Sequence, residues 1–223
     1  MSIDISIIIP TYQERNLAGL VSQLEREVDE NTEVIFSDAL EKSDFPKLPS
    51  CFTVIRSPRG RARQMNEGAR QAKGAILWFL HADTGIPPQA LASIRVAMKD
   101  ARAGSFQLHF DQDDWFFSVL AKCANLRSKW TRIPFGDQAI FIDNGLFKAI
   151  GGFSEIPLME ELVLMKKIRS RKEAITILDA FVTTSTRRWQ DKGRFKTTAL
   201  NLALQLAHKC GVSETHLARW YYG

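Results

Sequence analysis

Acidic and aromatic side chains follow three short apolar runs of this 223-residue chain, at points where strands are expected to end. Tyr12 and Glu14 follow the first run. Asp38 follows the second run, and Asp83 follows a later one. If these runs are parallel strands, their carboxyl ends meet at one sheet edge, where ligands usually bind. Asp83 would suit a divalent cation that bridges two phosphates, but it could equally be the N-cap of a helix beginning near Pro87.

Hydrophobic periodicity predicts the elements that must position these residues. Uninterrupted apolar runs, typical of buried strands, lie at residues 5–9, 33–37, 52–55 and 75–80. Helices with one apolar face are expected at 17–28, 60–72 and from 87 onward. The alternation predicts an α/β fold with a mostly parallel central sheet and helices on both faces.

The second half of the chain continues the same domain, because no linker or change in composition separates it from the first. Strands are expected at 104–110, 138–142 and 174–182, and helices at 115–126, 157–168 and 195–209. In the last of these helices, Leu202, Ala203 and Leu206 are expected to face the core. Residues 1–223 therefore form one domain, with a nucleotide-binding half at about 1–103 and an acceptor half at about 104–223.

Composition narrows the class of protein. No apolar run approaches the roughly 20 residues of a membrane-spanning helix, and residues 1–6 do not resemble a secretory signal. Three widely spaced cysteines favour packed thiols over disulfides or a zinc site. A soluble protein of the reducing cytoplasm is expected.

The net charge of +5 is distributed unevenly. Basic residues gather at 56–63 and at 187–196, and such clusters attract phosphates. No pattern of a nucleic-acid-binding protein is present, so no nucleic-acid partner is expected. Trp220, Tyr221 and Tyr222 could touch a membrane, although a packed terminus is favoured. Peripheral contact with the inner face of the membrane is therefore an open expectation, as is the oligomeric state.

Seven short motifs occur in a fixed order between residues 5 and 222. They are 7–14 (IIIPTYQE), 60–68 (GRARQMNEG), 79–84 (FLHADT), 135–138 (FGDQ), 151–153 (GGF), 156–161 (IPLMEE) and 185–189 (STRRW). Together they resemble the family-2 inverting glycosyltransferases, which have the A-type glycosyltransferase fold. Within that family the set is most similar to a compact bacterial subgroup associated with radical-SAM and selenium-related proteins.

The resemblance implies a site for a nucleotide-sugar donor, with a UDP-sugar favoured over GDP-mannose. Residues that would hold the base and ribose are Pro10, Tyr12, Glu14 and Asp38; those lining the rest of the donor pocket are Gly60, Arg61, Gln64, His81 and Ala82. Asp83 would correspond to the last acid of the family's Asp-x-Asp motif and would bind Mn²⁺ or Mg²⁺. Without the resemblance, His81 would be assigned to the sheet rim as an ordinary polar residue.

The resemblance also implies the catalytic and acceptor residues. Glu161 would be the general base, which accepts the proton of the attacking hydroxyl, and Glu160 and Asp137 are further catalytic candidates. Residues expected to border the acceptor are Gly136, Gln138, Arg187, Arg188 and Trp189. Two alternatives stay open from the residues alone: Glu160 and Glu161 could be exposed glutamates at a helix N-terminus, and Trp189 could belong to the core.

This chain departs from two of the family's motifs. Ala39 and Leu40 follow Asp38 where the family usually has glycine and serine, and Glu161 stands where aspartate is usual. Since small errors in placement can slow a reaction strongly, the alternative hypothesis is a nucleotide-sugar-binding protein that has lost turnover. The acceptor, whether a sugar, a lipid-linked molecule or a small metabolite, is not indicated.

Overall fold

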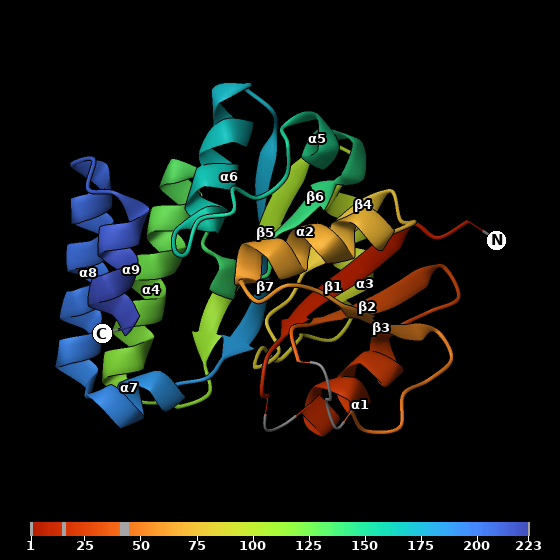
Figure 1. The fold of residues 1–223 in the computed structure, drawn as a ribbon, viewed down its shortest axis with the longest axis horizontal. Helices are drawn as coiled ribbons and strands as arrows, with labels where there is room; N and C mark the ends of the chain where they lie inside the picture. Colours follow the sequence, from red (N-terminus) through yellow and green to blue (C-terminus); the bar gives the residue numbers. More distant parts are fainter. Residues whose placement is uncertain (1, 15–16, 41–44, 223) are drawn as a thin grey trace.

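A computed structural model describes residues 2–14, 17–40 and 45–222 of the chain. Its centre is a seven-stranded sheet in the order β3-β2-β1-β4-β6-β5-β7. The strands are β1 (Ile5–Thr11), β2 (Thr32–Asp38), β3 (Phe52–Arg56), β4 (Ile76–Phe79), β5 (Ala103–Phe110), β6 (Phe141–Asp143) and β7 (Ile175–Thr184). Figure 1 shows the sheet passing through the molecule, with the N-terminal strands on the right and the C-terminal helices on the left.

Helices follow most of the strands. They are α1 (Leu17–Glu27), α2 (Arg61–Gln71), α3 (Ala90–Ala97), α4 (Trp115–Thr131), α5 (Asn144–Ala149), α6 (Glu160–Ser170), α7 (Arg187–Lys192), α8 (Arg194–Lys209) and α9 (Glu214–Tyr222). A 3₁₀ turn, η1 (Gly136–Gln138), precedes β6. Three short helices, α5, α7 and α9, were not predicted from the sequence.

The strands of the first half pair as the sequence predicted. β1 pairs in parallel with β2 and with β4, and β2 pairs in parallel with β3. Only β6 runs against its neighbours β4 and β5, so the sheet is mostly parallel. Thr11 lies opposite Asp38 in the register of β1 and β2, which brings the carboxyl ends of these strands to one edge.

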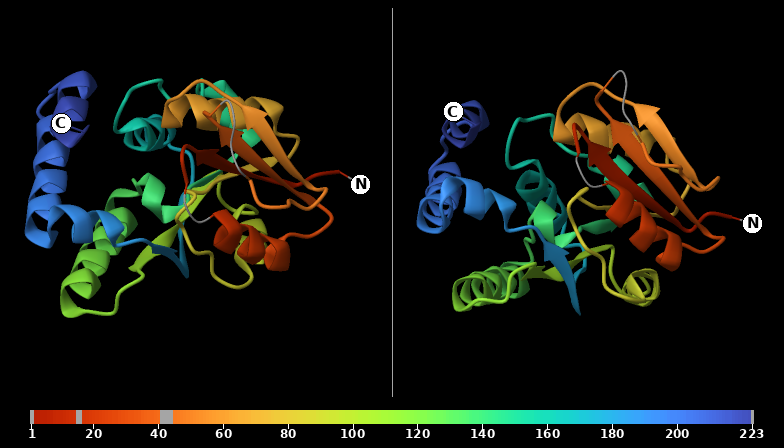
Figure 2. Two further views of the ribbon diagram at one scale, coloured as in Figure 1. Left: turned by 60° about the horizontal axis from the view of Figure 1, so that its bottom comes forward. Right: turned by 90° about the horizontal axis from the view of Figure 1, so that it is seen from below.

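The core has two layers, one on each face of the sheet. Ile7 and Ile9 of β1 pack with α1 and α3 on one face, whereas Ile8 packs with α2, α5 and α6 on the other. Successive side chains of a strand point to opposite faces, so the continuous apolar run of β1 serves both layers. Figure 2 shows helices on both sides of the sheet, as expected.

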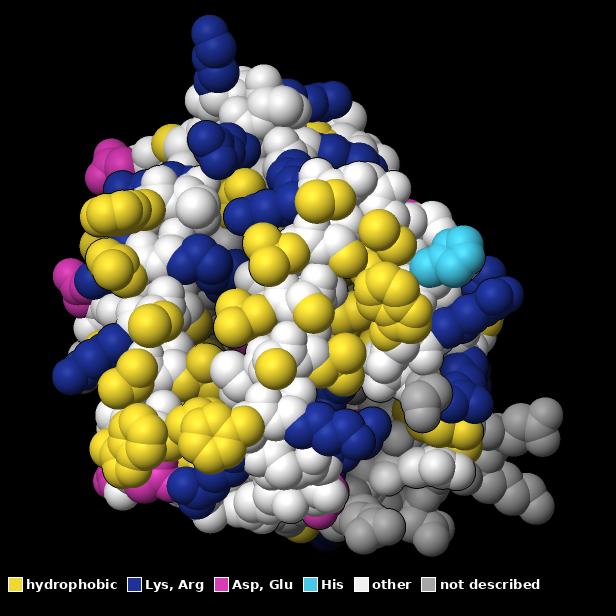
Figure 3. Space-filling view, turned by 90° about the vertical axis from the view of Figure 1, so that its left-hand side faces the viewer, with side chains coloured by type: hydrophobic (Ala, Val, Ile, Leu, Met, Phe, Trp, Pro, Cys, Tyr) yellow, Lys and Arg dark blue, Asp and Glu magenta, His cyan; other side chains and the backbone are white. Residues whose placement is uncertain are grey.

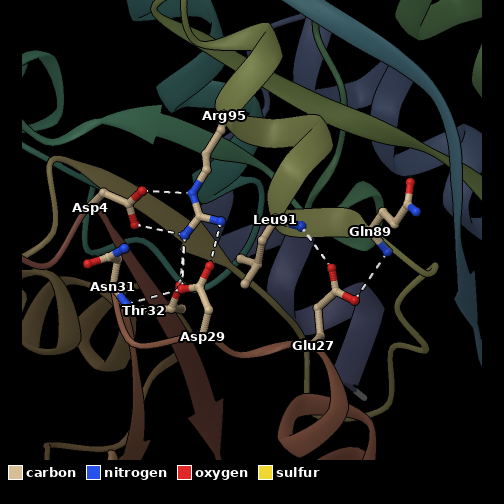
Figure 4. Close-up of polar contacts among 8 residues, drawn as sticks. All are labelled: Asp4, Glu27, Asp29, Asn31, Thr32, Gln89, Leu91 and Arg95. Atoms are coloured by element: carbon tan, nitrogen blue, oxygen red, sulfur yellow. Dashed lines mark hydrogen bonds and ion pairs between the residues drawn. The ribbon is translucent and has the colours of Figure 1, made fainter.

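An arginine of α3 fastens that helix to the start of β1 and the α1–β2 turn. Arg95 forms ion pairs with Asp4 and Asp29 (Figure 4). The carboxylate of Glu27 accepts hydrogen bonds of 3.1 Å from the backbone N–H groups of Gln89 and Leu91. These bonds satisfy N–H groups at the start of α3, whose N-cap Gln89 supplies no side-chain cap. The helix therefore begins three residues after Pro87, later than expected.

Three sequence expectations about burial were wrong. Leu202 and Leu206 of α8 face outward instead of into the core, and Ala203 is exposed as well. The three cysteines are free thiols, as expected, but all are exposed rather than packed.

No helix in the described ranges is long and apolar enough to cross a membrane.

Gly68 allows α2 to lie directly on β1. A Cβ atom at this position would overlap Cγ2 of Ile8 and would lie 3.5 Å from Cβ of Ile8. We expect Gly68→Ala to lower the free energy of unfolding by about 1–3 kcal/mol, the usual cost of an extra methyl group in a packed core. Denaturant unfolding measures this change.

The matched control is Gly145→Ala in α5, where the nearest atom to an added Cβ is a carboxylate oxygen of Asp143 at 3.2 Å. Alanine favours helices over glycine, so this variant should be as stable as the wild type or more so. Equal stability of both variants would contradict the proposed close contact.

Candidate active site

Two buried glutamates begin α6 and face the first residue of α2. Glu160 is 1% exposed and Glu161 is 6% exposed, so the alternative of exposed N-terminal glutamates is wrong. Nε of Arg61 lies 2.5 Å from Oε1 of Glu160 and 3.3 Å from Oε1 of Glu161. One guanidinium therefore serves two carboxylates and connects α2 with α6.

The two carboxylates differ in proton affinity. Burial would raise the pKa of Glu161, but the charges of Arg61 and His81 outweigh burial and lower it to about 2. The pKa of Glu160 is raised by burial and by the charge of Glu161, although Arg61 opposes the rise. The closer contact of Arg61 with Glu160 would favour the opposite assignment. However, only Glu161 also faces His81, at 3.7 Å, so we place the negative charge on Glu161.

His81 and Gly136 complete the surroundings of Glu161. An added Cβ at Gly136 would lie 2.7 Å from Cδ of Glu161 and 2.9 Å from Nε2 of His81, so only glycine fits there. Oε1 of Glu161 accepts no hydrogen bond from any residue in the described part of the chain. Next to Gly136, the pKa of Asp137 is raised by burial and by Glu161 against the charges of His81 and Arg127.

A cavity of about 580 Å³ collects most of the residues expected from the sequence. Expected residues that line it are Pro10, Tyr12, Glu14, Arg61, Gln64, His81, Ala82, Asp83, Gly136, Asp137, Glu161, Arg187, Arg188 and Trp189. They come from the carboxyl ends of β1 and β4, from the starts of α2 and α6, and from α7 and η1. The sheet edge and Glu161 thus line one cavity.

Four expected residues do not line this cavity. Asp38 is buried, forms an ion pair with Arg56 and accepts a 3.0 Å hydrogen bond from the hydroxyl of Thr11. Gln138 is buried and accepts hydrogen bonds from Ser128 and from the backbone N–H of Phe135. Gly60 is the N-cap of α2 and has a φ of 135°. Glu160 forms an ion pair with Arg61. Asp38 and Gln138 therefore hold neighbouring segments together through side-chain contacts.

Gln64 combines both kinds of role. Its side-chain nitrogen donates hydrogen bonds of 2.7 Å and 2.9 Å to the carbonyl groups of Thr11 and Ser37. These bonds hold the ends of β1 and β2 together beneath α2. The side chain also lines the cavity.

Asp83 is exposed on the loop after β4 and is not the N-cap of α3, since that position is Gln89. Asp83 and Glu14 also line a smaller adjoining cavity of about 260 Å³. The pKa of Glu14 is raised by burial and by the charge of Asp83, with Arg187 opposing. Two carboxylates this close are stabilised by a cation between them.

The donor set at this point is small. No group of three or more His, Cys, Asp or Glu side chains able to hold a metal occurs within residues 2–14, 17–40 and 45–222. Mg²⁺ is commonly bound by one or two carboxylates together with substrate phosphates. Asp83 and Glu14 fit that mode in the number and kind of their ligand atoms.

Sequence reasoning missed the contribution of α9. The guanidinium of Arg188 lies 3.6 Å from the ring centre of Tyr221, and one of its nitrogens is buried without a hydrogen-bond partner among the described residues. Burial raises the pKa of Tyr221, and Arg188 opposes that rise. The run of aromatic residues at 220–222 was the only signal for this contact. Trp189 lines the cavity, and its ring centre also lies 5.2 Å from that of Phe110, so it packs partly in the core, and its place beside the acceptor stays a prediction.

Solved structures with the same fold are glycosyltransferases. The mannosyltransferase PcManGT from Pyrobaculum calidifontis, in complex with GDP-Man and Mn²⁺, superposes with a TM-score of 0.66 at 21% identity, over 93% of this chain and 63% of that one. S. aureus TarS residues 1–349, in complex with UDP-GlcNAc, gives a TM-score of 0.63 at 19% identity, over 82% of this chain and 59% of that one. GalNAc-T7 with UDP, GalNAc and Mn²⁺ gives 0.62 at 14%, over 82% and 44%. At these identities the likeness establishes the A-type glycosyltransferase fold.

The chain spans less than two thirds of the length of each of these three structures. No curated protein sequence matches it. The family model described as "Glycosyl transferase family 2" matches residues 6–154, more than half of the chain. The chain therefore belongs to glycosyltransferase family 2.

Proposed function

We propose that this family-2 glycosyltransferase moves a sugar from a nucleotide-diphosphate sugar to an acceptor hydroxyl in a single inverting displacement. The observation that carries the proposal is the place of Glu161. It is a buried, ionised carboxylate that lines the same cavity as the strand ends that carry Tyr12 and Asp83. Its Oε1 lies 3.3 Å from Arg61 and accepts no hydrogen bond from the residues that the structure describes. A base on one side of the cavity and a diphosphate site on the other suit a displacement in line.

The donor would lie along the sheet edge. The ring of Tyr12 already carries the guanidinium of Arg59 at 4.3 Å and offers a face for the base, next to Pro10. A UDP-sugar is favoured by the resemblance, and the UDP-GlcNAc bound to TarS is compatible with it. GDP-mannose is the second donor to test, as bound to PcManGT.

Mn²⁺ or Mg²⁺ held by Asp83 and Glu14 would neutralise the charge that develops on the departing diphosphate. The protein's own groups supply the other half of the reaction. The acceptor oxygen attacks the anomeric carbon, the bond from that carbon to the diphosphate oxygen breaks, and the hydroxyl proton passes to Glu161. Gly136 lets the backbone of η1 lie directly against Glu161 and His81, because a side chain at this position would overlap both.

Arg61 would connect the two halves of the reaction. A carboxylate whose pKa is about 2 is a weak base. A diphosphate in the cavity would attract Arg61, which lines it, and would weaken its hold on Glu161. The proton affinity of Glu161 would then rise when the donor is bound, which is when the base is needed.

Several finer expectations remain proposals. Residues 1–103 would bind the donor and residues 104–223 the acceptor. The radical-SAM and selenium-associated bacterial subgroup rests on the order of the motifs, and a cytoplasmic location rests on the composition. The alternative function, a nucleotide-sugar-binding protein without turnover, rests on Ala39, Leu40 and Glu161.

The first test concerns the metal and the donor. Calorimetry with UDP, GDP, ADP and dTDP, each with and without Mn²⁺ or Mg²⁺, should show metal-dependent binding of UDP or GDP. Asp83→Ala should weaken that binding at least tenfold, because a carboxylate ligand is lost. The control variant is Asp100→Ala, since Asp100 is exposed on the loop between α3 and β5. It should bind as the wild type does. Absence of binding for every diphosphate in every metal would exclude the donor site.

The second test separates an enzyme from a binding protein. Glu161→Gln should slow donor hydrolysis and transfer by roughly 10²–10⁴-fold, the usual contribution of a general base, with donor affinity within about threefold of the wild type. The matched control is Glu155→Gln, which removes only a surface ion pair with Arg63 and should leave both values unchanged. If the wild type itself hydrolyses and transfers nothing while binding donor tightly, the binding-protein alternative is correct.

The third test concerns the pH dependence of kcat/KM, which reports groups of the free enzyme. With the pKa of Glu161 at about 2, the wild type should show no acid limb due to this group down to about pH 5. Arg61→Met removes a charge that lowers the pKa of Glu161, so burial should raise that pKa. Since the ionised carboxylate is the active form, activity should now fall as the pH is lowered through the raised pKa.

Arg63→Met is the control for this test, because Arg63 is exposed on the same helix and pairs with Glu155 at 3.0 Å. Its pH profile should match the wild type. An acid limb at the same pH in Arg61→Met and Arg63→Met would show that Arg61 does not set the pKa of the base.

A further inference from the structure

Large apolar side chains are exposed on the three helices α4, α8 and α9. We call these residues the apolar face: Trp115, Val119, Leu126 and Trp130 of α4, Phe195, Leu202 and Leu206 of α8, and Trp220 and Tyr222 of α9. Trp130 is 81% exposed, Phe195 is 74% and Trp115 is 72%. Contiguous exposed apolar surface of this kind marks an interaction site. Figure 3 shows hydrophobic side chains spread over this side of the molecule, where α8 and α9 lie in Figure 1.

Helical spacing makes the exposure systematic. Residues 195, 202 and 206 of α8 share one stripe, and the buried residues Thr197 and Leu204 lie on the opposite side. Residues 115, 119, 126 and 130 of α4 form a second stripe, away from its buried residues. Each helix is amphipathic, but its more continuous apolar stripe points outward. The sequence expectation for α8 was wrong for this reason.

The segments that carry the apolar face are rich in basic residues. Two of these residues, Lys129 and Arg194, form ion pairs with Asp179 and Asp114, and Arg127, Arg187 and Arg188 line the cavity. Residues 187–222 contain seven Lys or Arg and two Asp or Glu, a surplus of five that equals the net charge of the whole chain. Residues 115–131 add Lys122, Arg127 and Lys129 and contain no acidic residue. In Figure 3, Lys and Arg side chains are interspersed among the apolar ones, while acidic side chains are few and lie near the margins.

The catalytic cavity extends to this face. Apolar residues of α4, α8 and the start of α6 form one of its walls: Leu120, Cys123, Leu158, Leu162, Leu202 and Leu204. Leu202 lines the cavity and is also 56% exposed, and Cys123 likewise is exposed. The apolar lining of the cavity therefore continues into the apolar face at Leu202.

Charge decides between two ways of covering the apolar face. A second copy of the chain in a two-fold contact would place the same basic residues against each other, which costs free energy. An anionic membrane pairs with basic residues, accepts apolar side chains into its interface, and accommodates Trp and Tyr at that depth. The described helices do not span a membrane, so the contact would be peripheral.

We propose that the apolar face rests on an anionic membrane surface, and that the acceptor is a lipid whose chain enters the apolar part of the cavity with its hydroxyl toward Glu161. The membrane contact stands independently of the catalytic assignment. The identity of the acceptor as a lipid rests on the proposed function.

Vesicle sedimentation tests the membrane contact. The protein should bind vesicles of phosphatidylglycerol and phosphatidylcholine, with weaker binding to pure phosphatidylcholine and in high salt. Lys196→Glu with Lys209→Glu should weaken binding at least tenfold, because each basic residue near an anionic surface contributes to binding. Lys99→Glu with Lys148→Glu makes the same change in net charge outside the apolar face and should bind like the wild type.

The apolar contribution is tested in the same way. Trp130→Ser with Leu206→Ser should weaken binding at least tenfold, and neither residue lines the cavity. Val96→Ser with Phe181→Ser removes two exposed apolar side chains elsewhere and should have little effect. Wild-type protein that does not bind anionic vesicles, or that binds equally in all four variants, overturns the proposal. So does a stable dimer that the Trp130 and Leu206 changes dissociate.

The lipid part is tested by binding rather than by transfer, so its failure is distinct from failure of the catalytic assignment. Cys123 is exposed and lines the cavity, and it can carry a fluorescent label once Cys51 and Cys210 are replaced by serine. Octyl glucoside below its micelle concentration should cause a saturable shift in emission to shorter wavelength, and glucose should not. Leu204→Gln should abolish the shift. No saturable shift with octyl glucoside, or an equal one with glucose, would rule out the lipid site.

Discussion

The arrangement of this molecule depends on one guanidinium placed between two buried carboxylates. Neither Glu160 nor Glu161 could hold a charge at its depth without a positive partner, because an unpaired buried charge is very costly. Arg61 supplies that partner from another helix. The position of Glu161 therefore depends on how α2 packs on the sheet. That packing depends in turn on the contact of Gly68 with Ile8 and on the hydrogen bonds of Gln64 to β1 and β2.

The same constraint divides the cavity into regions of different charge. Glu14 and Asp83 make the strand edge acidic, which suits the cation proposed for this site. Arg61, Arg187 and Arg188 lie around the cavity, where they can meet phosphate oxygens. Because Arg61 also controls the proton affinity of Glu161, donor binding and activation of the base would draw on a single side chain. A change at Arg61 therefore affects both functions together.

Much of the fold was predictable because β1, β2 and β4 are buried on both faces, which leaves uninterrupted apolar runs in the sequence. The ordered motifs also identified most residues of the cavity. Contacts between distant segments were not predictable: periodicity cannot show that Arg188 lies over Tyr221, or that Asp38 is held by Thr11 and Arg56. The outward face of α8 was misjudged for a related reason, since spacing shows which residues share a side but not which side is covered.

The outward apolar face of α8 is consistent with separate donor and acceptor regions in the proposed reaction. An in-line displacement needs the acceptor and the leaving diphosphate on opposite sides of the anomeric carbon. The polar strand ends and apolar side chains of α4 and α8 both line the cavity that contains Glu161. A water-soluble donor and an amphiphilic acceptor can reach such a site from different directions without competing for one entrance. An exposed Leu202 would not stabilise a helix that serves only to cover the core. It is expected if α8 borders the proposed acceptor entrance at a membrane surface.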